Sequence, residues 1–329
     1  MTNLKLSRYQ FLHLTAGAAA LPAVSRIARA QAYPTRPITL IVPVAPGGSI
    51  DGTARVLAER MRGSLGQPVI IENVSGAEGR IAVGRAASAR PDGYMIDLGG
   101  IGSHVLNGAL YALRYDVLND FVPISLVGTT WFVLYAKKTM PARDLNELIA
   151  WLHANPNAAS AGNTGPGARL LYVVLQKETG TRFAIVPYRG GAPAMQDLVS
   201  GQIDLLFNTP EGLRLVQAGS AKAYAVASDT RLAVAPDIPT FAQMGLPALT
   251  FSQWAGLFAP KGTPRDLIGT LNAAVVEALG DPAVRSQFAD LGFEVVPRER
   301  QTPEALGAVV KADAAKWWPI IKEAGMRGE

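Results

Sequence analysis

The stretch LIVPVAPGGSIDGTARVLAERM, residues 40–61, indicates the fold class of this chain. Its apolar first part, Leu40–Val44, is typical of a buried β-strand, and the amphipathic part from Ile50 onward is typical of a helix. Between them stands Pro46-Gly47-Gly48-Ser49, a glycine-rich turn. In α/β proteins such a turn is a place for anions, because the first N–H groups of the helix have no partner within the helix.

Strand-like and helix-like segments alternate from Tyr33 onward. We expect strands at 38–45, 67–74 and 94–100, and helices at 50–66, 78–91 and 103–112. After Pro123 the pattern restarts, with strands expected within 124–138, near 158–163, and at 183–188, 202–208 and 223–228, and helices at 144–156, 168–180 and 192–201. A further strand within 252–260 and two or three helices within 266–324 complete the chain. This alternation predicts mostly parallel sheets with helices on both faces.

Two such units in one chain predict two domains. The chain is expected to cross from the first unit to the second near Gly128–Trp131 and to return near Trp254–Leu257. The predicted fold class is therefore α/β, with two doubly wound domains, a hinge and a central cleft. Domain 1 would comprise 33–127 plus 257–329, and domain 2 would comprise 128–256.

The first 32 residues have the composition of an export signal peptide. Lys5 and Arg8 precede the apolar stretch Phe11–Val24, and small residues follow, which predicts cleavage near Ala30 or Ala32. The apolar part is shorter than the roughly 20 residues that span a bilayer. The segment SRYQFL resembles a twin-arginine signal but carries Tyr9 in place of the second arginine, so the export route stays open. The predicted location is the periplasm.

Charge and composition exclude several function classes. Residues 1–32 hold four cations and no acidic residue, so of the net charge of +5 only about +1 belongs to the rest of the chain. A nucleic-acid binder needs a concentrated basic face, and we expect none. The chain has no cysteine, which excludes thiolate metal sites and thiol nucleophiles. A chain of 329 residues can bury a core large enough to fold without disulfides.

The turn at residues 46–52 does not match the nucleotide and nucleophile motifs that it superficially resembles. A P-loop needs a lysine after its last glycine, and Thr53 stands there. The order Gly47-Gly48-Ser49-Ile50-Asp51-Gly52 fits neither the dinucleotide fingerprint nor the G-x-S-x-G nucleophile elbow. The turn offers instead backbone N–H groups at a helix start, a hydroxyl donor from Ser49, and a carboxylate from Asp51 that can hold the turn.

Histidines give little support to catalysis or metal binding. His13 falls in the predicted leader, and His153 is expected on a solvated helix end. His104 follows Ser103 at a turn and could approach the cleft, but we do not expect it to be catalytic. No pair of histidines has metal-ligand spacing, so neither a metal nor a cofactor is predicted.

The glycine-rich turn recurs twice. Gly99–Ser103 and Ala161–Gly165 also follow a strand and open a helix, and Pro166 suits the first helical position. In an open α/β sheet these loops lie at the carboxyl ends of strands, where ligands bind. Two such loops come from the first unit and one from the second, so a small acid with one or two carboxylates could bridge them.

Seven segments, in order and over about 290 residues, resemble the tripartite tricarboxylate transporter substrate-binding proteins, also called the Bug family of periplasmic receptors. They are YPTRPITLIVPVAPGGSID, ARPDGYMIDLGG, YDVLNDFVPISLVG, ASAGNTGPG, VPYRGGAPAMQDLVSGQID, PDIPTFAQMGLP and WAGLFAPKGTPRDLIGTLN. The resemblance implies a two-domain protein similar to type II periplasmic binding proteins. Such a protein would bind small carboxylates through loop amides, hydroxyls and waters. It also implies delivery to a two-component membrane permease, and we expect a monomer without enzymatic activity.

The ligand contacts implied by the resemblance come from both domains. They are Gly47, Gly48, Ser49, Asp51 and Ser103 in the first, and Ala161, Gly162, Asn163, Thr164 and Asn208 in the second. Two departures stand out. Relatives commonly have Ser-His-Leu where this chain has Ala168-Arg169-Leu170, and Asp where it has Asn208. Loss of that carboxylate removes a partner for a ligand ammonium, so we hypothesise a ligand without an amino group.

Two further questions stay open at this stage. Arg169 could pair with the ligand or lie on a solvated helix face, and Trp131, Phe132 and Trp254 could wall the cleft or pack in the hinge and core. The rival function is an exported α/β hydrolase or isomerase that uses Ser49 or Ser103.

Overall fold

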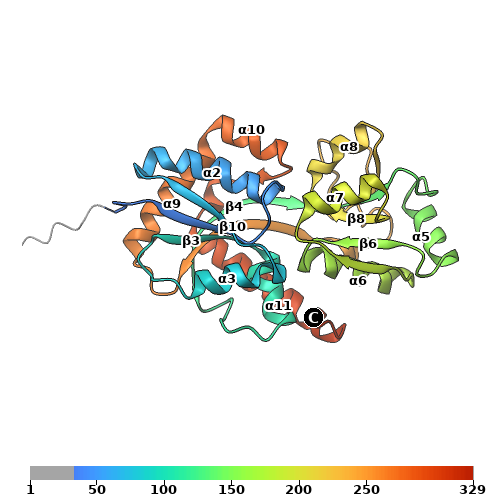
Figure 1. Cartoon of the computed structure of the whole chain (residues 1–329), viewed down its shortest axis with the longest axis horizontal. Helices are drawn as coiled ribbons and strands as arrows, with labels where there is room; N and C mark the ends of the chain where they lie inside the picture. The colour runs from blue at the N-terminus through green and yellow to red at the C-terminus, as the bar shows by residue number, and fades with distance from the viewer. Residues whose placement is uncertain (1–32, 329) are drawn as a thin grey trace, which may run out of the picture. The chain divides into compact units, whose positions relative to one another are not determined.

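The structure is a computed structural model that describes residues 33–328, and Arg36–Glu329 form one compact unit. The predicted export signal and its cleavage sites lie outside the described residues. Two β-sheets organise the unit, each with helices packed against it (Figure 1).

The first sheet has the strand order β11-β4-β10-β3-β1-β2. The strands are β1 Ile38–Val42, β2 Val69–Asn73, β3 Met95–Gly100, β4 Phe121–Trp131, β10 Ser252–Pro260 and β11 Glu294–Val295. β2, β1 and β3 pair in parallel, and β10 lies antiparallel between β3 and β4. Strands β1 to β4 therefore share one direction, and only β10 and β11 run against it.

Helices cover both faces of this sheet. They are α2 Ser49–Leu65, α3 Arg80–Ala87, α4 Asn107–Leu110, α9 Arg265–Gly280, α10 Pro282–Asp290 and α11 Pro303–Glu323. Figure 1 shows α2 and α10 on one side of the sheet and α3 and α11 on the other. α2 illustrates the cause: Ala54, Leu57, Ala58 and Met61 recur at helical spacing and are buried, while Gly66 in the left-handed conformation ends the helix.

The second sheet has the strand order β7-β6-β8-β5-β9. Its strands are β5 Val133–Lys137, β6 Ser160–Asn163, β7 Ala184–Pro187, β8 Leu205–Asn208 and β9 Ala221–Val226. Its helices are α5 Leu145–Ala154, α6 Pro166–Thr179, α7 Gly191–Ser200 and α8 Leu213–Gln217. β7, β6 and β8 pair in parallel, and β5 runs antiparallel to β8 and β9.

The chain passes between the sheets at two adjacent places. Only Phe132 separates β4 in the first sheet from β5 in the second. On the return, an irregular segment ends at β10, whose Ser252 pairs with Trp131. Main-chain hydrogen bonds of 2.8 Å from Ala227 N to Phe132 O and of 3.0 Å from Phe251 N to Ala227 O tie the passages together. The domain boundaries at 127/128 and 256/257 stay predictions.

The predicted elements are present with shifted ends, but the sheets are mixed and not mostly parallel, because β5, β10 and β11 pair antiparallel with their neighbours. Three further features depart from expectation. Residues 103–112 form a π-helical turn, Gly102–Leu106, followed by the short α4, instead of one helix. The five-residue α8 and the two-residue β11 are too short to leave a periodic pattern in the sequence. Asp144 caps α5, accepting a 2.9 Å hydrogen bond from Glu147 N.

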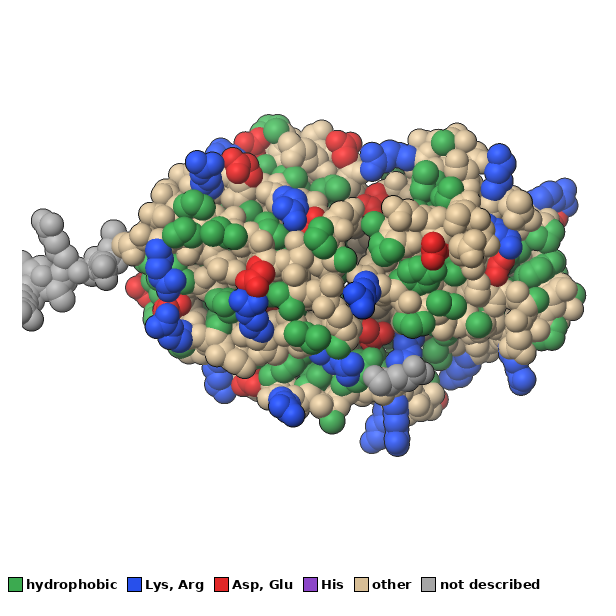
Figure 2. Space-filling model, viewed as in Figure 1, with side chains coloured by type: hydrophobic (Ala, Val, Ile, Leu, Met, Phe, Trp, Pro, Cys, Tyr) green, Lys and Arg blue, Asp and Glu red, His purple; other side chains and the backbone are tan. Residues whose placement is uncertain are grey.

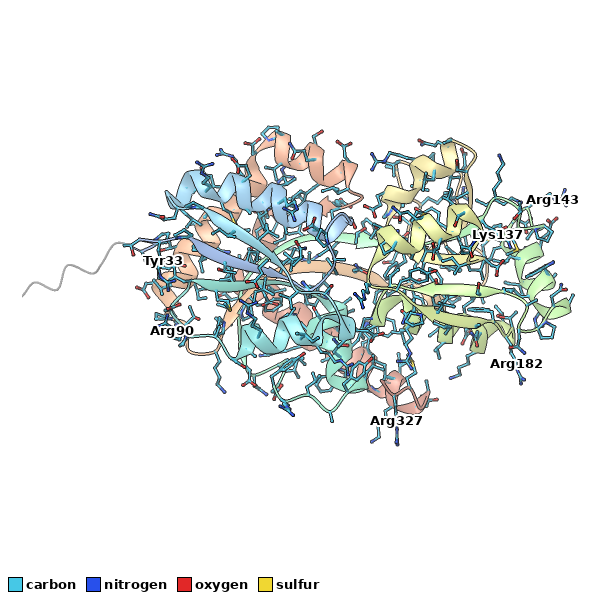
Figure 3. All side chains as sticks on the ribbon, viewed as in Figure 1. Tyr33, Arg90, Lys137, Arg143, Arg182 and Arg327 are labelled. Carbon is cyan, nitrogen blue, oxygen red and sulfur yellow. The ribbon has the colours of Figure 1, made fainter. Side chains whose placement is uncertain are left out.

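Charged side chains are dispersed over the surface. On the face shown in Figure 2, Lys and Arg are interspersed with Asp and Glu, as a body of low net charge requires. Arg90, Arg143 and Arg182 lie at the periphery (Figure 3). Among the described residues no single helix is long and apolar enough to cross a membrane. Helices α9 and α10 reach that length and apolarity only when taken together, and the chain bends by 78° between them.

Candidate functional site

A cavity of about 960 Å³ lies where loops of the two sheets face each other. The loops follow β1, β2 and β3 in the first sheet and β6, β7 and β8 in the second, so nearly all come from strand carboxyl ends. This is the position at which open α/β sheets bind ligands.

The start of α2 forms one wall of the cavity. Gly48, Ser49 and Ile50 line it, and the first helical bond runs from Gly52 N to Gly48 O, which leaves earlier N–H groups unpaired within the helix. Gly47 has φ +95°, a conformation that favours glycine. The sequence predicted this anion-suited helix start, and the geometry agrees with it.

Asp51 holds the turn from behind. Its carboxylate accepts hydrogen bonds of 3.0 Å from Gly47 N, 2.9 Å from Arg55 Nε and 2.8 Å from Asn73 Nδ2. Burial by itself would raise the pKa of Asp51, but these bonds together hold it below its ordinary value. The carboxylate is committed to the protein, which indicates a supporting role for Asp51.

Ser49 connects the two sides of the cavity. Its hydroxyl lies 3.1 Å from the Thr209 hydroxyl, which follows β8, and both side chains are buried. Thr209 was not among the predicted residues, because nothing in the sequence shows that position 209 faces position 49.

The loop after β3 places Ser103 on the cavity wall. Its hydroxyl oxygen accepts a 3.1 Å hydrogen bond from Gly100 N and lies 3.1 Å from His104 Nδ1. His104 itself is fully buried, against Phe258 and Phe121, and burial lowers its pKa to about 3. The expectation that His104 could approach the cleft is therefore wrong, because the side chain is buried in the core.

On the opposite wall, the loop after β6 contributes Asn163 and Thr164. Asn163 Oδ1 accepts a 3.0 Å hydrogen bond from Gly165 N, which shapes the turn into α6 with Pro166 at its first position. Ala161 and Gly162 lie further back, inside β6, paired with β7 and β8.

Sequence reasoning missed two loops that also line the cavity. Gly190, Gly191 and Ala192 open α7 beside Asn208, whose amide leaves no room for a side chain on Gly191. Gly76–Gly79, after β2, presents Glu78, which has φ +54° and is held by a 3.0 Å hydrogen bond from Asn107 Nδ2 to its carbonyl. Both loops follow a strand and contain paired or spaced glycines, so the pattern noted at residues 47–48 would have found them.

Three arginines and two glutamates line the cavity: Arg80, Arg169, Arg189, Glu78 and Glu211. Arg80 lies 3.3 Å over the Tyr111 ring, and Arg169 donates a 2.7 Å hydrogen bond to Arg327 O. Glu78 accepts hydrogen bonds from Tyr111 and Asn163. Within residues 33–328, Arg189 alone of the three arginines makes no hydrogen bond, ion pair or ring contact.

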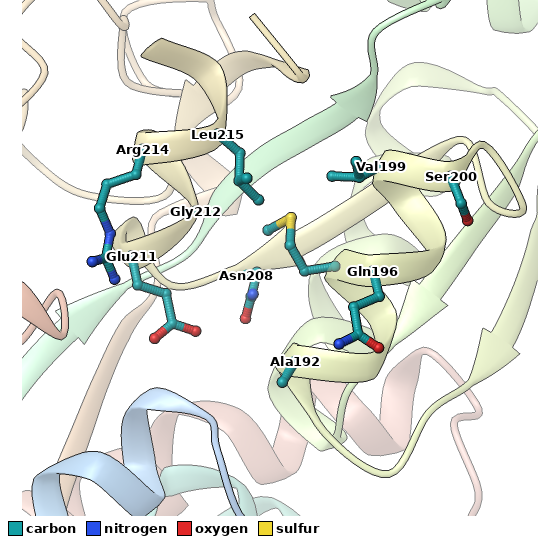
Figure 4. A pocket seen from close by; sticks show the side chains of 10 residues that line it. Ala192, Gln196, Val199, Ser200, Asn208, Glu211, Gly212, Arg214 and Leu215 are labelled. Carbon is teal, nitrogen blue, oxygen red and sulfur yellow. The ribbon is translucent and has the colours of Figure 1, made fainter. Parts of the chain in front are cut away.

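A side groove of about 550 Å³ adjoins the cavity and shares Ala192, Asn208 and Glu211 with it. Figure 4 shows Glu211 and Arg214 on one side and Gln196 and Val199 on the other, with Asn208 between them. Burial raises the pKa of Glu211 to about 7, against the opposing effects of a Thr209 hydrogen bond and of Arg214. This glutamate therefore titrates near neutral pH.

The aromatic residues near the crossings divide between wall and core. Phe132 and Trp254 line the cavity, but both are buried, and Trp254 donates a 2.7 Å hydrogen bond to Asp313 from its ring nitrogen. Trp131 is not on the cavity wall.

Six of the ten predicted contact residues lie on the cavity wall: Gly48, Ser49, Ser103, Asn163, Thr164 and Asn208. Gly47, Asp51, Ala161 and Gly162 lie in the same loops or strands but not on the wall. Ligand contact by any of the ten stays a prediction. Among the described residues no group of three or more His, Asp or Glu side chains could hold a metal ion.

Two sheets, two adjacent chain passages and a cavity of helix N-termini define a solute-binding protein of the periplasmic kind. Residues 53–326 match the family described as "Tripartite tricarboxylate transporter family receptor". The chain belongs to this family, which confirms the resemblance read from its seven segments.

Solved structures of similar proteins support this assignment. The periplasmic binding protein BugD is 36 % identical with TM-score 0.86, covering 90 % of this chain and 100 % of its own. MatC from Rhodopseudomonas palustris, solved with malate, is 35 % identical with TM-score 0.84, at 88 % and 100 % coverage. An R. palustris protein solved with adipate is 30 % identical with TM-score 0.84, at 90 % and 99 % coverage. The family and these neighbours are solute-binding receptors.

Proposed function

We propose that this protein captures a small organic carboxylate, such as a dicarboxylate, tricarboxylate or aromatic acid, in the 960 Å³ cavity. One observation carries the proposal: α2, α6 and α7 all begin at this cavity, so their unpaired N–H groups and dipole ends converge on it. The malate and adipate bound by the two R. palustris proteins are acids of this class.

The proposed ligand carries no amino group. Asn208 is a neutral amide that faces the start of α7, and Arg189 adds an unpaired cation. Glu211 is the carboxylate nearest to Asn208 in the chain, and its raised pKa leaves it partly protonated near pH 7. A ligand ammonium would therefore find a weaker partner here than beside a fully ionised aspartate.

A thermal-shift screen tests the proposal with citrate, C4–C6 dicarboxylates, aromatic acids and amino acids. A bound acid should raise the melting temperature by mass action, and isothermal titration should then give a one-site dissociation constant. The dimethyl ester of the same acid is the matched control, because it keeps the shape and lacks the charge. A response to aspartate or glutamate, with none to amine-free acids, would contradict the ligand class.

We further propose that the protein is exported, loses its leader near Ala30 or Ala32, and presents its ligand as a monomer to a two-component permease. Mass spectrometry of the periplasmic form should give a mature N-terminus at residue 31 or 33. A cytoplasmic product that retains residue 1 would contradict export.

The rival function, hydrolysis with Ser49 or Ser103, finds less support. Ser49 contacts Thr209 and no histidine, and the imidazole beside Ser103 has its pKa lowered to about 3 by burial, which makes it a poor base at neutral pH. Carboxylate esters should not turn over. Turnover lost in a Ser49→Ala, Ser103→Ala double variant would instead establish an enzyme.

A further inference from the structure

Three side chains form a line from the cavity wall into the interior. The Ser103 hydroxyl oxygen lies 3.1 Å from His104 Nδ1, and His104 Nε2 lies 3.5 Å from Asp97 Oδ2. Ser103 lines the cavity, whereas His104 and Asp97 are 0 % and 1 % exposed. The line connects the proposed binding surface to two buried titratable groups that the proposed function has not used.

Packing fixes the His104 ring in this line. It stacks on Phe258 with ring centroids 4.1 Å apart and meets Phe121 edge-on at 4.7 Å. A side chain on Gly99 would overlap the imidazole, so glycine is required there. The ring therefore holds one orientation, with Nδ1 toward the cavity and Nε2 toward Asp97.

The surroundings of the buried pair disfavour a charge on either side chain. Within residues 33–328, His104 Nε2 and both Asp97 carboxyl oxygens lack a hydrogen-bond partner, and a buried charge without partners is costly. Burial raises the pKa of Asp97 well above its ordinary value and lowers that of His104. Tyr115 is the other titratable group that interacts with Asp97, and burial raises its pKa to about 12. These surroundings favour a protonated Asp97 carboxyl and a neutral His104 imidazole.

A neutral pair can place its protons in two ways. In the first, the Asp97 carboxyl proton points toward His104 Nε2, 3.5 Å away, and His104 donates from Nδ1 to Ser103 Oγ. Ser103 Oγ then accepts from His104 and from Gly100 N, and its own proton is free to donate. In the second, His104 carries its proton on Nε2 and accepts the Ser103 proton at Nδ1. The hydroxyl then has no proton left for a ligand.

Only the first arrangement suits an anion, because a carboxylate oxygen accepts and cannot donate. We propose that Asp97 and His104 are positioning residues that hold Ser103 as a hydrogen-bond donor to a ligand carboxylate. The inference rests on the proposed carboxylate binding. When the cavity holds no ligand, the Ser103 proton points to Gly100 O, 3.3 Å away, and on binding it turns to the ligand.

Nuclear magnetic resonance of the protein labelled with ¹³C,¹⁵N-histidine tests the tautomer without any ligand. The chain has three histidines, so His13→Gln and His153→Gln variants assign the His104 signals. The expected result at pH 7 is a neutral His104 with its proton on Nδ1. A proton on Nε2, or an imidazolium, overturns the proposal.

Affinity variants test the effect on binding, with malate as the probe and adipate where malate gives no thermal shift. Ser103→Ala should weaken binding about tenfold or more, as for a lost hydrogen bond to a charged group. Asp97→Leu should weaken it similarly, whereas Asp97→Asn, whose amide can still donate to His104 Nε2, should stay within about threefold of wild type.

The double variant separates positioning from a general structural role. If Asp97 acts through Ser103, adding Asp97→Leu to Ser103→Ala should change the affinity by no more than about twofold. If Asp97→Leu weakens binding as much in the Ser103→Ala background as it does in wild type, the proposal is overturned. If wild type binds no carboxylate, the proposed function fails, and the tautomer measurement still decides the proton arrangement separately.

Discussion

Glu211 is the residue at the cavity whose charge changes near physiological pH. Burial is the main cause, and it raises the pKa of Glu211 from 4.5 to about 7. The unfolded chain releases this proton at lower pH, so Glu211 lowers folding stability as the pH rises from about 4.5 through about 7. A bound carboxylate would add a second negative charge to the same region.

Binding of a carboxylate should therefore be tighter at pH 6 than at pH 8. Protonating Glu211 removes the repulsion, and a group with a pKa near 7 can change the affinity by up to about tenfold over this interval. Isothermal titration at both pH values, with an acid that stays fully ionised, measures the ratio of the dissociation constants at pH 8 and pH 6. In Glu211→Gln the ratio should fall to near one, and an unchanged ratio would show that another group is responsible.

Arg189 is an exposed cation on the cavity wall, and within residues 33–328 its side chain has no partner. We expect Arg189→Gln to weaken the binding of a dicarboxylate by roughly three- to tenfold. The binding of a monocarboxylate of similar length should weaken by less, because Arg189 would pair with the second carboxylate. Arg182→Gln is the matched control, since it removes the same charge at a peripheral, exposed position (Figure 3). Equal losses for both ligands, or in both variants, would contradict this role.

At the scale of elements, the proposed anion site is formed by three helix starts, and glycine-containing loops set their positions. α2, α6 and α7 begin with Gly48, Gly165 and Gly190 at their N-caps, none of which provides a capping side chain. The free N–H groups at these three ends are left for a ligand or water. By contrast α5, away from the cavity, is capped by Asp144.

Removing the support behind α2 should affect both stability and binding. Asp51→Ala leaves Gly47 N without its acceptor and Asn73 Nδ2 with Val44 O alone, so we expect a loss of about 1–3 kcal/mol in unfolding free energy and weaker carboxylate binding. Asp144→Ala is the control: it should cost about 1 kcal/mol and leave affinity unchanged. Denaturant unfolding and titration measure both; wild-type affinity in Asp51→Ala would show that the turn holds its shape without the carboxylate.

At the scale of the whole unit, two chain passages and several side-chain contacts relate the two sheets. The passages at Phe132 and before Ser252 lie side by side, which is the arrangement of a hinge. The Ser49–Thr209 contact, 3.1 Å between hydroxyl oxygens, spans the cavity between them. Hinge closure around the ligand is consistent with this geometry and belongs to the proposed function.

A disulfide at this contact should lock the cavity. The chain has no cysteine, so Ser49→Cys with Thr209→Cys gives one possible disulfide. If binding needs the hinge to open, the oxidised form should take up ligand at least about tenfold more slowly than the reduced form. The single-cysteine variants control for loss of the hydroxyls. Equal uptake rates in the oxidised and reduced double variant would show that entry needs no opening here.

The sequence by itself determined the α/β class, the elements and the glycine-rich turns of the cavity. These follow from local patterns: apolar alternation, helical spacing at residues such as Leu57 and Met61, and glycines where a strand turns into a helix. The seven sequence segments, in their order along the chain, also showed the family resemblance. Residues 103–112 were mispredicted as one helix, because a π-helical turn has no periodic signature of its own.

Only the tertiary structure decided which groups meet. Thr209 reaches Ser49 across 160 positions, and Asn163 reaches Glu78 across 85, distances at which no local pattern operates. Burial decided the chemistry of His104, Asp97 and Glu211, since their charge states depend on surroundings assembled from several strands and helices. Residue types specify backbone preferences locally, whereas a binding cavity and its electrostatics arise from contacts that exist only after the chain has folded.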